Sequence, residues 1–299
     1  MNSKIKRALG NPYYACELVL NQLAPLFSDE RYVKWKYYLN FRRKLNLQNP
    51  QTFNEKLQWL KLYDRHEEYT QMVDKCEAKK YVASIIGEEY IIPMLGVYDS
   101  FDEINFDELP NQFVLKCTHN SGGIVICKDK QTMDIKKSRK KMNKWMKKNP
   151  FWGNREYPYK HVKPRIIAEQ YMKQEDGESL RDYKVLCFHG KAKLIELHQN
   201  RNQPNYTQDF YDINWNKTPI AQVGDPVSDC AYAKPQNLDL MIKYSEVLTN
   251  NMKHCRVDWY EINGKLYFGE MTFFDASGLT PFEKIEDDIL LGSWIDINN

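Results

Sequence analysis

The sequence predicts an α+β fold in which a helical start precedes a strand-rich remainder. The first hundred residues carry apolar side chains at helical spacing and are punctuated by prolines, the last of them Pro93. After Pro93 the pattern changes to short apolar runs that are typical of strands. We therefore expect a helical N-terminal region over residues 1–72 and a larger domain over residues 73–299, which carries the chemistry.

Two helices in the first half have recognisable ends. Thr52 and Glu55 form the pattern of a capping box, in which each side chain accepts a hydrogen bond from the backbone amide of the other residue. This pattern predicts a helix start at Thr52. A second helix is expected over residues 73–86, ending at Gly87. The later strands are expected at residues 113–117, 124–127, 165–169, 183–188 and 193–197.

Composition limits the classes of protein that the chain can belong to. Of its 299 residues 42% are apolar, which is enough for a substantial core. The net charge of +3 does not call for a nucleic-acid partner. Seven cysteines lie scattered without a C-x-x-C pair, which argues against a zinc site and a disulfide scaffold and indicates a reducing, cytoplasmic compartment. We find no secretion signal in the basic start, residues 1–14, and no membrane span.

Two basic stretches interleave charges with apolar side chains. Residues 136–148 predict an amphipathic helix, and we favour a solvated outer face over a site for an anionic membrane or glycan. Residues 31–44 combine basic and aromatic side chains, and we favour packing of the aromatic face over contact with RNA or a membrane. A nucleic-acid binder is the least favoured interpretation of the chain.

A hairpin near the C-terminus directs two acids toward one site. Asp258 lies on the first strand and Glu270 on the return strand, with Asn263-Gly264 as the turn. A two-residue type I′ turn would put the two acids on opposite faces, whereas a three-residue loop with a G1 bulge at Gly264 would put them together. Two carboxylates on one face, with Arg256 beside them, are typical of a Mg²⁺ site that also holds nucleotide phosphates. A half-exposed hairpin with solvated acids is the alternative.

A glycine-containing tip follows the first expected strand of the larger domain. The segment runs from Lys116 through Asn120, Ser121, Gly122 and Gly123 before the next strand. Such a tip can close over phosphates, because backbone amides and a hydroxyl donate to phosphate oxygens and the lysine adds charge. Neither a Walker-type G-x-x-x-x-G-K-[ST] nor a G-x-G-x-x-G after a strand occurs. A nucleotide must therefore be held in a different way.

Two further segments could contact a nucleotide. Glu169, Gln170, Tyr171 and Met172 follow an apolar strand, as expected of a hinge whose backbone binds adenine. Asp182 and Lys184 share one face of a strand. They are candidates for a ribose contact and a phosphate contact respectively, and the alternative is an exposed ion pair of little energetic weight.

The order of these motifs resembles the ATP-grasp family. A strand lysine, a glycine tip, a hinge glutamate, an Asp-x-Lys strand and an Arg-x-Asp followed by Glu-x-Thr extend from about residue 113 to residue 278. The resemblance implies a lid subdomain at about 100–167 and a catalytic subdomain at about 168–299. It implies that ATP is bound by Lys116, Asn120–Gly123, Glu169–Met172 and Asp182, that Mg²⁺ is bound by Asp258, Glu270 and Thr272, and that Lys184 and Arg256 are catalytic. At the third metal position the family usually has asparagine, so Thr272 is a weaker ligand here.

One branch of the family is especially similar. Residues 50–61, 87–93, 113–116 and 268–270 match phrases of the TupA-like proteins, which are associated with teichuronopeptide, capsule and surface-polysaccharide assembly. The resemblance implies an ATP- and Mg²⁺-dependent carboxylate-amine ligase that acts through an acylphosphate on a sugar acid or acidic glycan. His119 and Ser277 are candidate substrate contacts. The alternatives are a phosphotransferase or glycosyltransferase-like enzyme, and a non-catalytic nucleotide-binding protein.

Overall fold

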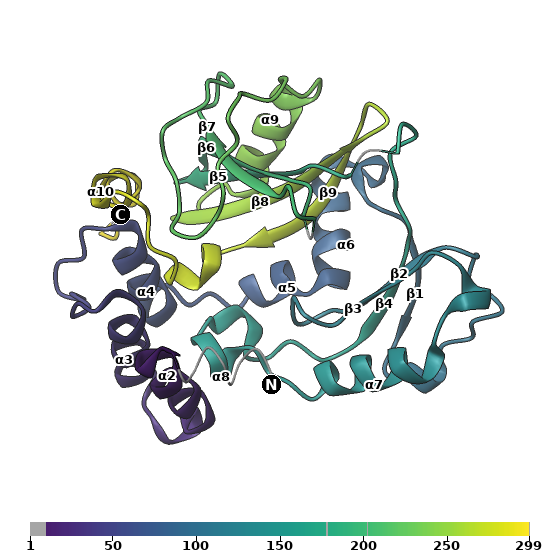
Figure 1. The fold of residues 1–299 in the computed structure, drawn as a ribbon, viewed down its shortest axis with the longest axis horizontal. Helices are drawn as coiled ribbons and strands as arrows, with labels where there is room; N and C mark the ends of the chain where they lie inside the picture. The colour runs from purple at the N-terminus through teal and green to yellow at the C-terminus, as the bar shows by residue number, and fades with distance from the viewer. Residues whose placement is uncertain (1–9, 178, 202, 299) are drawn as a thin grey trace.

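Two antiparallel sheets organise the chain, with helices before, between and around them (Figure 1). The computed structural model describes residues 10–177, 179–201 and 203–298. The small sheet has the order β1-β4-β2-β3, and the large sheet has the order β7-β6-β5-β8-β9. The strands are β1 (Met94–Tyr98), β2 (Phe113–Cys117), β3 (Ile124–Cys127), β4 (Ile166–Gln170), β5 (Asp182–Phe188), β6 (Lys191–Gln199), β7 (Thr207–Tyr211), β8 (His254–Ile262) and β9 (Lys265–Thr272).

The five strands expected between residues 113 and 197 are present, with ends shifted by up to two residues, and β8 and β9 form the expected hairpin. The strands β1 and β7 were not expected. Because β1 begins at Met94 and β4 ends at Gln170, the small sheet extends on both sides of the expected lid limits, 100 and 167. The helices are α2 (Pro12–Gln22), α3 (Asp29–Phe41), α4 (Phe53–Tyr63), α5 (Tyr69–Val73), α6 (Lys75–Ile86), α7 (Ile135–Met146), α8 (Phe151–Asn154), α9 (Leu238–Leu248) and α10 (Ile285–Ser293).

The expected helix ends are largely confirmed. Thr52 and Glu55 form the capping box that starts α4. The helix expected over residues 73–86 is two helices, because α5 ends at Val73 and Asp74 caps a new helix, α6, by accepting hydrogen bonds from two of its amides. Gly87 follows the end of α6, as predicted.

The large sheet has one apolar and one charged face. Its apolar face packs against α9, which lies above the sheet in Figure 1. Trp259 in β8 is buried there, and its indole Nε1 donates a hydrogen bond to Ser245 Oγ in α9 at 2.8 Å. Since the apolar side chains of β5, β6 and β8 alternate with polar ones, the opposite face is left to charged residues.

The small sheet is covered by α7, the basic helix. Met142 is fully buried against the sheet, while the basic side chains of the helix lie outside. This confirms the amphipathic helix expected over residues 136–148. In α3 the aromatic side chains divide, because Tyr32 and Tyr37 are buried whereas Trp35 is 54% exposed. None of the helices in the described part of the chain is long and apolar enough to cross a membrane.

The turn between β8 and β9 is a two-residue turn. Asn263 and Gly264 both have positive φ, 52° and 75°, and the flanking residues Ile262 and Lys265 pair directly. This is the type I′ geometry that was expected to separate the two acids, so the expected bulge at the turn itself is absent.

A β-bulge further along the hairpin reverses that consequence. Trp259 pairs with Phe268, but Val257 pairs with Met271. The two residues between Phe268 and Met271 therefore oppose a single residue, Asp258. The bulge shifts the register by one residue. Beyond it, the end of β9 has the register that a three-residue loop at the turn would have produced.

The bulge brings Glu270 to the face of Asp258. Gly269, its other residue, is closely approached, since an added Cβ would lie 3.0 Å from the Asp258 carbonyl oxygen and 3.1 Å from the Tyr260 ring. A side chain at position 269 would therefore disturb the bulge. The sequence expectation that both acids share a face is correct for a reason other than the turn.

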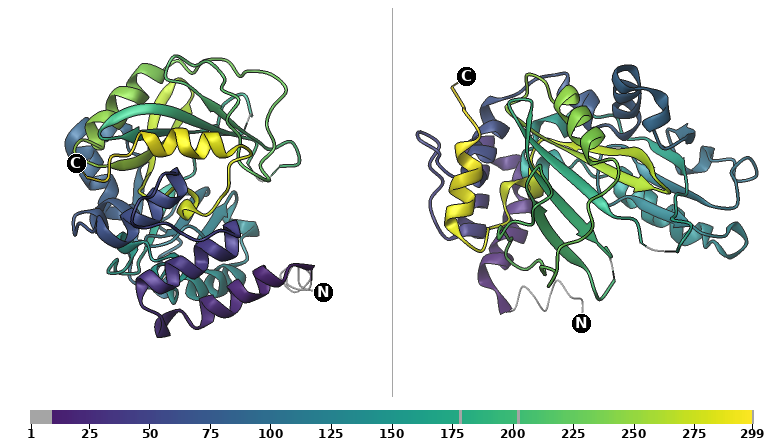
Figure 2. Two further views of the ribbon diagram at one scale, coloured as in Figure 1. Left: turned by 90° about the vertical axis from the view of Figure 1, so that its left-hand side faces the viewer. Right: turned by 90° about the horizontal axis from the view of Figure 1, so that it is seen from above.

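The C-terminal helix α10 lies against α4, as the left view of Figure 2 shows. Asp288 Oδ1 accepts hydrogen bonds from the backbone amide and the side-chain amide of Asn54 at 2.9 and 3.0 Å. Gly292 is in contact with the backbone before α4. A Cβ there would lie 2.2 Å from the Gln51 carbonyl oxygen and 2.7 Å from the Phe53 nitrogen.

We expect Gly292→Ala to lower the free energy of unfolding by about 1–3 kcal/mol, because the methyl group would collide with backbone atoms that cannot rotate away. Urea denaturation measures the change. Gly153→Ala is the matched control, since a Cβ at position 153 meets nothing within 4 Å. Equal effects of the two substitutions would contradict the close approach of α10.

Candidate functional site

Charged side chains form a row across the polar face of the large sheet. Lys184 in β5 pairs in register with Glu196 in β6 on one side and with Asp258 in β8 on the other. Arg256 in β8 pairs with Thr272 in β9. Three of the predicted site residues, Lys184, Asp258 and Arg256, are thus neighbours on adjoining strands.

Ion pairs join this row into a buried network. Arg256 donates to Asp258 from Nε to Oδ1 at 2.7 Å and from Nη2 to Oδ2 at 3.0 Å, and its Nη1 contacts Asp275. Lys184 Nζ contacts Asp258 and lies 3.1 Å from Asp182 Oδ2. Although burial opposes ionisation, Arg256 and Lys184 lower the pKa of Asp258 to about 2. Both oxygens of Asp258 therefore have cationic partners.

The pairing of Asp182 and Lys184 is buried rather than exposed. Their side chains are 5% and 2% exposed, so the alternative of a solvated ion pair with little energetic weight is wrong. Asp182 also binds Arg201, whose Nη1 lies 2.9 Å from Oδ2. The expected ribose contact of Asp182 therefore competes with two cations of the chain.

Glu270 is the more accessible of the two expected metal carboxylates. Its side chain is 39% exposed, and its oxygens lie 3.6 Å from Arg256 Nη2 and 3.7 Å from Lys75 Nζ. The Thr272 hydroxyl is 3.3 Å from Arg256 Nη2. Because these contacts are long, Glu270 keeps oxygen lone pairs for a further ligand.

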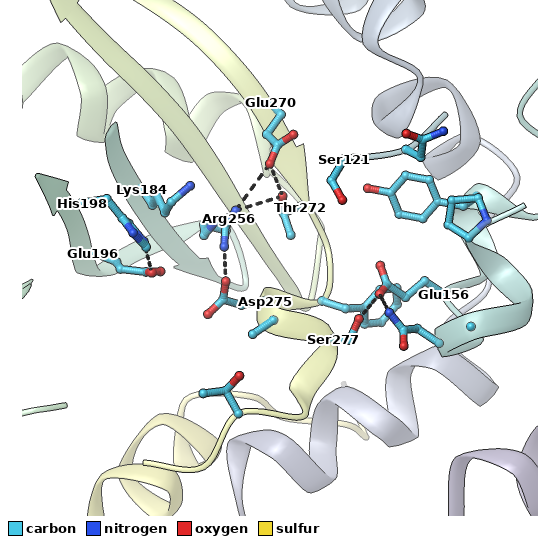
Figure 3. A pocket seen from close by; sticks show the side chains of 18 of the residues that line it. Ser121, Glu156, Lys184, Glu196, His198, Arg256, Glu270, Thr272, Asp275 and Ser277 are labelled. Atoms are coloured by element: carbon cyan, nitrogen blue, oxygen red, sulfur yellow. Dashed lines mark hydrogen bonds and ion pairs between the residues drawn. The ribbon is translucent and has the colours of Figure 1, made fainter. Parts of the chain in front are cut away.

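A cavity of about 800 Å³ opens over the charged row. Figure 3 shows Lys184, Glu196 and His198 on one side, Arg256, Glu270 and Thr272 in the centre, and Ser121, Glu156 and Ser277 on the other side. Its wall combines the large sheet, the tip of the small sheet and the segments around α8. Of the predicted residues, the cavity is lined by Asn120, Ser121, Lys184, Arg256, Glu270, Thr272 and Ser277.

The glycine tip packs on Trp145 of α7. Asn120 Oδ1 accepts hydrogen bonds from the backbone amides of Gly122 at 3.2 Å and Gly123 at 2.9 Å, which closes the tip. A Cβ at Gly122 would lie 2.2 Å from the Trp145 ring, and one at Gly123 would lie 2.3 Å from Cys117 Sγ. The glycines are therefore needed for protein packing in this state, and Ser121 is the exposed residue of the tip.

His119, an expected substrate contact, is turned away from the cavity. It is 2% exposed, it does not line the cavity, and its Nε2 lies 3.0 Å from the carbonyl oxygen of Lys148. Burial lowers its pKa. In this structure His119 supports the tip, and it contacts no space that a substrate can enter.

Glu169, at the start of the expected adenine hinge, is enclosed by two lysines. Its oxygens lie 2.6 Å from Lys116 Nζ in β2 and 3.0 Å from Lys79 Nζ in α6. Although burial opposes it, the two ammonium groups lower the pKa of Glu169 to about 2. The expected phosphate lysine, Lys116, is thus paired with Glu169. The hinge residues Gln170, Tyr171 and Met172 follow at the end of β4, and they do not line the cavity.

A second polar cluster lies on the far side of the cavity. The Ser277 hydroxyl donates to the Glu156 carboxylate, and Lys61 Nζ donates to the Ser277 carbonyl oxygen at 2.7 Å. Burial raises the pKa of Glu156, against the effect of Lys61, and burial lowers the pKa of Lys61 to about 7. Ser277 has φ 57°, the left-handed region, so its position is held by these contacts.

Several cavity residues were not predicted. Glu196 and His198 alternate with apolar residues in β6, and this is the same period-two pattern of charge that identified Asp182 and Lys184. That pattern is the sequence feature that could have revealed them. Other titratable members that were not predicted include Lys75, Glu156, Tyr206, Asp225 and Asp275, which come from separate segments.

A comparison with known protein families identifies the family of the chain. The family model described as TupA-like ATPgrasp matches residues 55–296. The chain belongs to the TupA-like ATP-grasp family. Its fold is accordingly an ATP-grasp fold of the α+β class, with two antiparallel sheets and a helical N-terminal region.

Solved structures show only distant likeness. The D-alanine–D-alanine ligase from Bacillus anthracis complexed with ATP is 16% identical at a TM-score of 0.42, with 68% of this chain and 55% of that chain covered. The corresponding ligase from Helicobacter pylori is 13% identical at a TM-score of 0.42, with 83% of this chain and 70% of that chain covered. An L-amino acid ligase from Bacillus licheniformis is 11% identical at a TM-score of 0.44, with 85% of this chain and 55% of that chain covered. No curated protein matches the sequence.

The first of these likenesses covers only about half of the ligase, and the TM-scores are too low to support any conclusion about function. Membership of the TupA-like ATP-grasp family therefore rests on the sequence match.

Mg²⁺ can be tested against the ligands that the chain offers. Within residues 10–177, 179–201 and 203–298, no group of three or more His, Cys, Asp or Glu is placed to hold a metal ion by itself. Glu270 and Thr272 present hard oxygen atoms to the cavity, which fits an ion that shares its coordination with phosphates and water. Asp258 fits this role only when Lys184 or Arg256 gives up a contact.

We expect Glu169→Gln to destabilise the protein by about 3 kcal/mol at pH 7, because it leaves two buried ammonium groups without their counter-charge. The pKa of Glu169 falls on folding from 4.5 to about 2, so its contribution is complete above pH 4.5 and is lost as the pH falls toward 2. The difference between wild type and variant should therefore shrink over that range.

Urea denaturation between pH 7 and pH 3 measures this difference. Glu67→Gln, which changes an exposed acid in the same way, is the control and should have little effect at any pH. A pH-independent effect of Glu169→Gln would contradict the pairing with Lys79 and Lys116.

Proposed function

We propose that the chain is an ATP- and Mg²⁺-dependent carboxylate-amine ligase that joins a sugar acid or acidic glycan to an amine. The proposal is supported by one observation above the others. Lys184, Arg256 and Glu270, from three strands, face a single cavity together with the tip residue Ser121. Family membership supports a nucleotide-dependent activity of this kind.

In the proposed reaction an oxygen of the substrate carboxylate attacks the γ-phosphorus of ATP, and ADP leaves. The amine nitrogen, in its neutral form, then forms a bond to the acyl carbon, phosphate leaves with the electrons of the broken C–O bond, and the nitrogen releases one proton to the departing phosphate. Lys184 and Arg256 lower the energy of the charge that develops, because they are fixed in place by acids before the substrate arrives. No covalent enzyme intermediate is required.

Nucleotide phosphates enter a site whose cations are already paired. Lys116 binds Glu169 and Arg256 binds Asp258 in this structure, so we propose that phosphate oxygens take over part of these contacts. From the tip, Ser121 offers a hydroxyl donor at the cavity. Bound Mg²⁺, held by Glu270 and Thr272 and by Asp258 once released, would neutralise phosphate charge.

The biological setting is proposed from family membership alone. We propose a cytoplasmic role in the assembly of capsule or another surface polysaccharide, with a small molecule or glycan as the partner and no nucleic acid. The basic face of α7 is the surface proposed for peripheral contact with a membrane or a lipid-linked glycan.

Product analysis tests the reaction class. We expect incubation with ATP, Mg²⁺, a panel of uronic acids and a panel of amino compounds to give ADP, phosphate and an amide, with the amide formed only when an amine is present. Mass spectrometry of the products decides the outcome. A stable phosphate ester would indicate a phosphotransferase instead, and ATP binding without turnover across the panel would indicate a non-catalytic nucleotide-binding protein.

We expect Glu270→Gln to lower ATP turnover by about 100-fold or more with little change in the melting temperature. The substitution removes a ligand charge from the cavity and keeps the side-chain volume. Turnover is measured by ADP release under saturating Mg²⁺. Glu283→Gln, at an exposed position outside the cavity, is the matched control. Wild-type turnover in Glu270→Gln would refute the assignment of Glu270.

A further inference from the structure

Three side chains on the β6 side of the cavity form a chain of hydrogen bonds. Glu196 Oε1 contacts His198 Nε2, and the Tyr206 hydroxyl lies 2.7 Å from His198 Nδ1. The rings of His198 and Tyr206 are stacked, with centroids 5.7 Å apart. Both nitrogens of His198 are therefore engaged, and the imidazole fixes the orientation of the Glu196 carboxylate.

The second oxygen of Glu196 has no partner. Oε2 is buried and accepts no hydrogen bond from any residue in the described part of the chain, although Glu196 is only 3% exposed and lines the cavity. Figure 3 shows this carboxylate beside His198 at the cavity wall. A buried ionised oxygen without a donor is costly, so the site calls for a donor from a bound molecule.

The charges around Glu196 show which kind of donor fits. The buried part of the row holds four carboxylates, those of Asp182, Glu196, Asp258 and Asp275. It holds two buried cations, Lys184 and Arg256, and a third cation, Arg201, has a side chain that is 55% exposed. The close contacts of both buried cations go to the other three carboxylates, and Arg256 also lies 3.6 Å from Glu270. Glu196 is thus the carboxylate of the row whose direct partner is an imidazole, at Oε1, and not a lysine or arginine, and a positively charged donor fits beside its open Oε2.

An ammonium group fits this position better than a metal ion. Among the described residues no group of three or more His, Cys, Asp or Glu could hold a metal. The adjoining wall instead offers uncharged or singly charged oxygen acceptors, from Gln208, Gln222 and Asp225. A primary ammonium has three N–H donors, which suit one open carboxylate oxygen in a cavity whose wall also carries such acceptors.

We propose that Glu196 binds the primary ammonium group of the amine substrate, with His198 and Tyr206 as positioning residues. This deepens the proposed ligase function and rests on it for the identity of the ligand. The amine would bind on the β6 side of the cavity, while the nucleotide phosphates occupy the part of the cavity near Ser121 and Glu270. The two substrates then approach the charged row from opposite sides.

The binding test uses the full chain and methylammonium as the probe, because the natural amine is not needed for it. The ring nitrogens of the six histidines are labelled with ¹⁵N, and the signal of His198 is assigned by its loss in His198→Asn. We expect methylammonium chloride to shift the His198 signal in a saturable manner. Tetramethylammonium carries the same charge without N–H donors, and it should leave the signal unchanged.

Two variants locate the site. Glu196→Gln should weaken the apparent affinity for methylammonium by about tenfold or more, because a charged hydrogen bond is lost. Glu156→Gln, at the other carboxylate cluster of the same cavity, should leave the affinity unchanged. Circular dichroism checks the fold of each variant. If Glu196→Gln does not fold, the comparison of the two ammonium ions on the native chain decides alone.

The outcomes separate this inference from the proposed function. Equal responses to both ammonium ions, no response to either, or an unchanged affinity in Glu196→Gln would each overturn the ammonium site. Displacement of methylammonium by MgCl₂, but not by an equal ionic strength of NaCl, would assign the site to the metal and overturn the inference as well. Selective methylammonium binding without amide formation would leave the site standing and overturn the ligase function, and amide formation without binding would do the reverse.

Discussion

The ion-pair network of Lys184, Asp258 and Arg256 is the constraint on which the rest of the site depends. It joins β5 to β8 on the polar face, and it extends to Asp182 and Asp275. Charges at such depth are stable only when each has its partners, and removal of one partner typically costs about 3–5 kcal/mol. The network therefore fixes the positions of Lys184 and Arg256 beside the cavity.

The network also gives the two expected metal ligands different characters. Asp258 is saturated by cations, whereas Glu270 is held at long distances and faces open space. The bulge opposite Asp258 produces this difference. It shifts the register of β9 by one residue, so that Glu270 lies on the polar face, whereas the turn alone would have put it on the opposite face. A site with one fixed and one accessible acid can remain electrostatically stable when it is empty and still accept a charged ligand.

Sequence patterns predicted the parts of the structure that depend on local spacing. Alternation identified the shared face of Asp182 and Lys184, and Asn263-Gly264 predicted the turn. The bulge was placed wrongly, because nothing local distinguishes Gly269 from an ordinary strand glycine. Pairings between distant segments were also missed. The burial of Glu169 between Lys79 and Lys116 joins a helix to two strands, and no spacing rule connects residues so far apart along the chain.

The helix α6 touches both sheets. Its Lys79 reaches Glu169 in the small sheet, the amide of Lys75 donates to the Thr118 carbonyl oxygen beyond β2, and the helix packs on β9 of the large sheet. A swing of one whole sheet away from the other would have to break these contacts together. The helix therefore restrains the distance between the two sheets. A wider opening of the cavity would then come from movement of the short hairpin end around Ser121 and of the segments that face it.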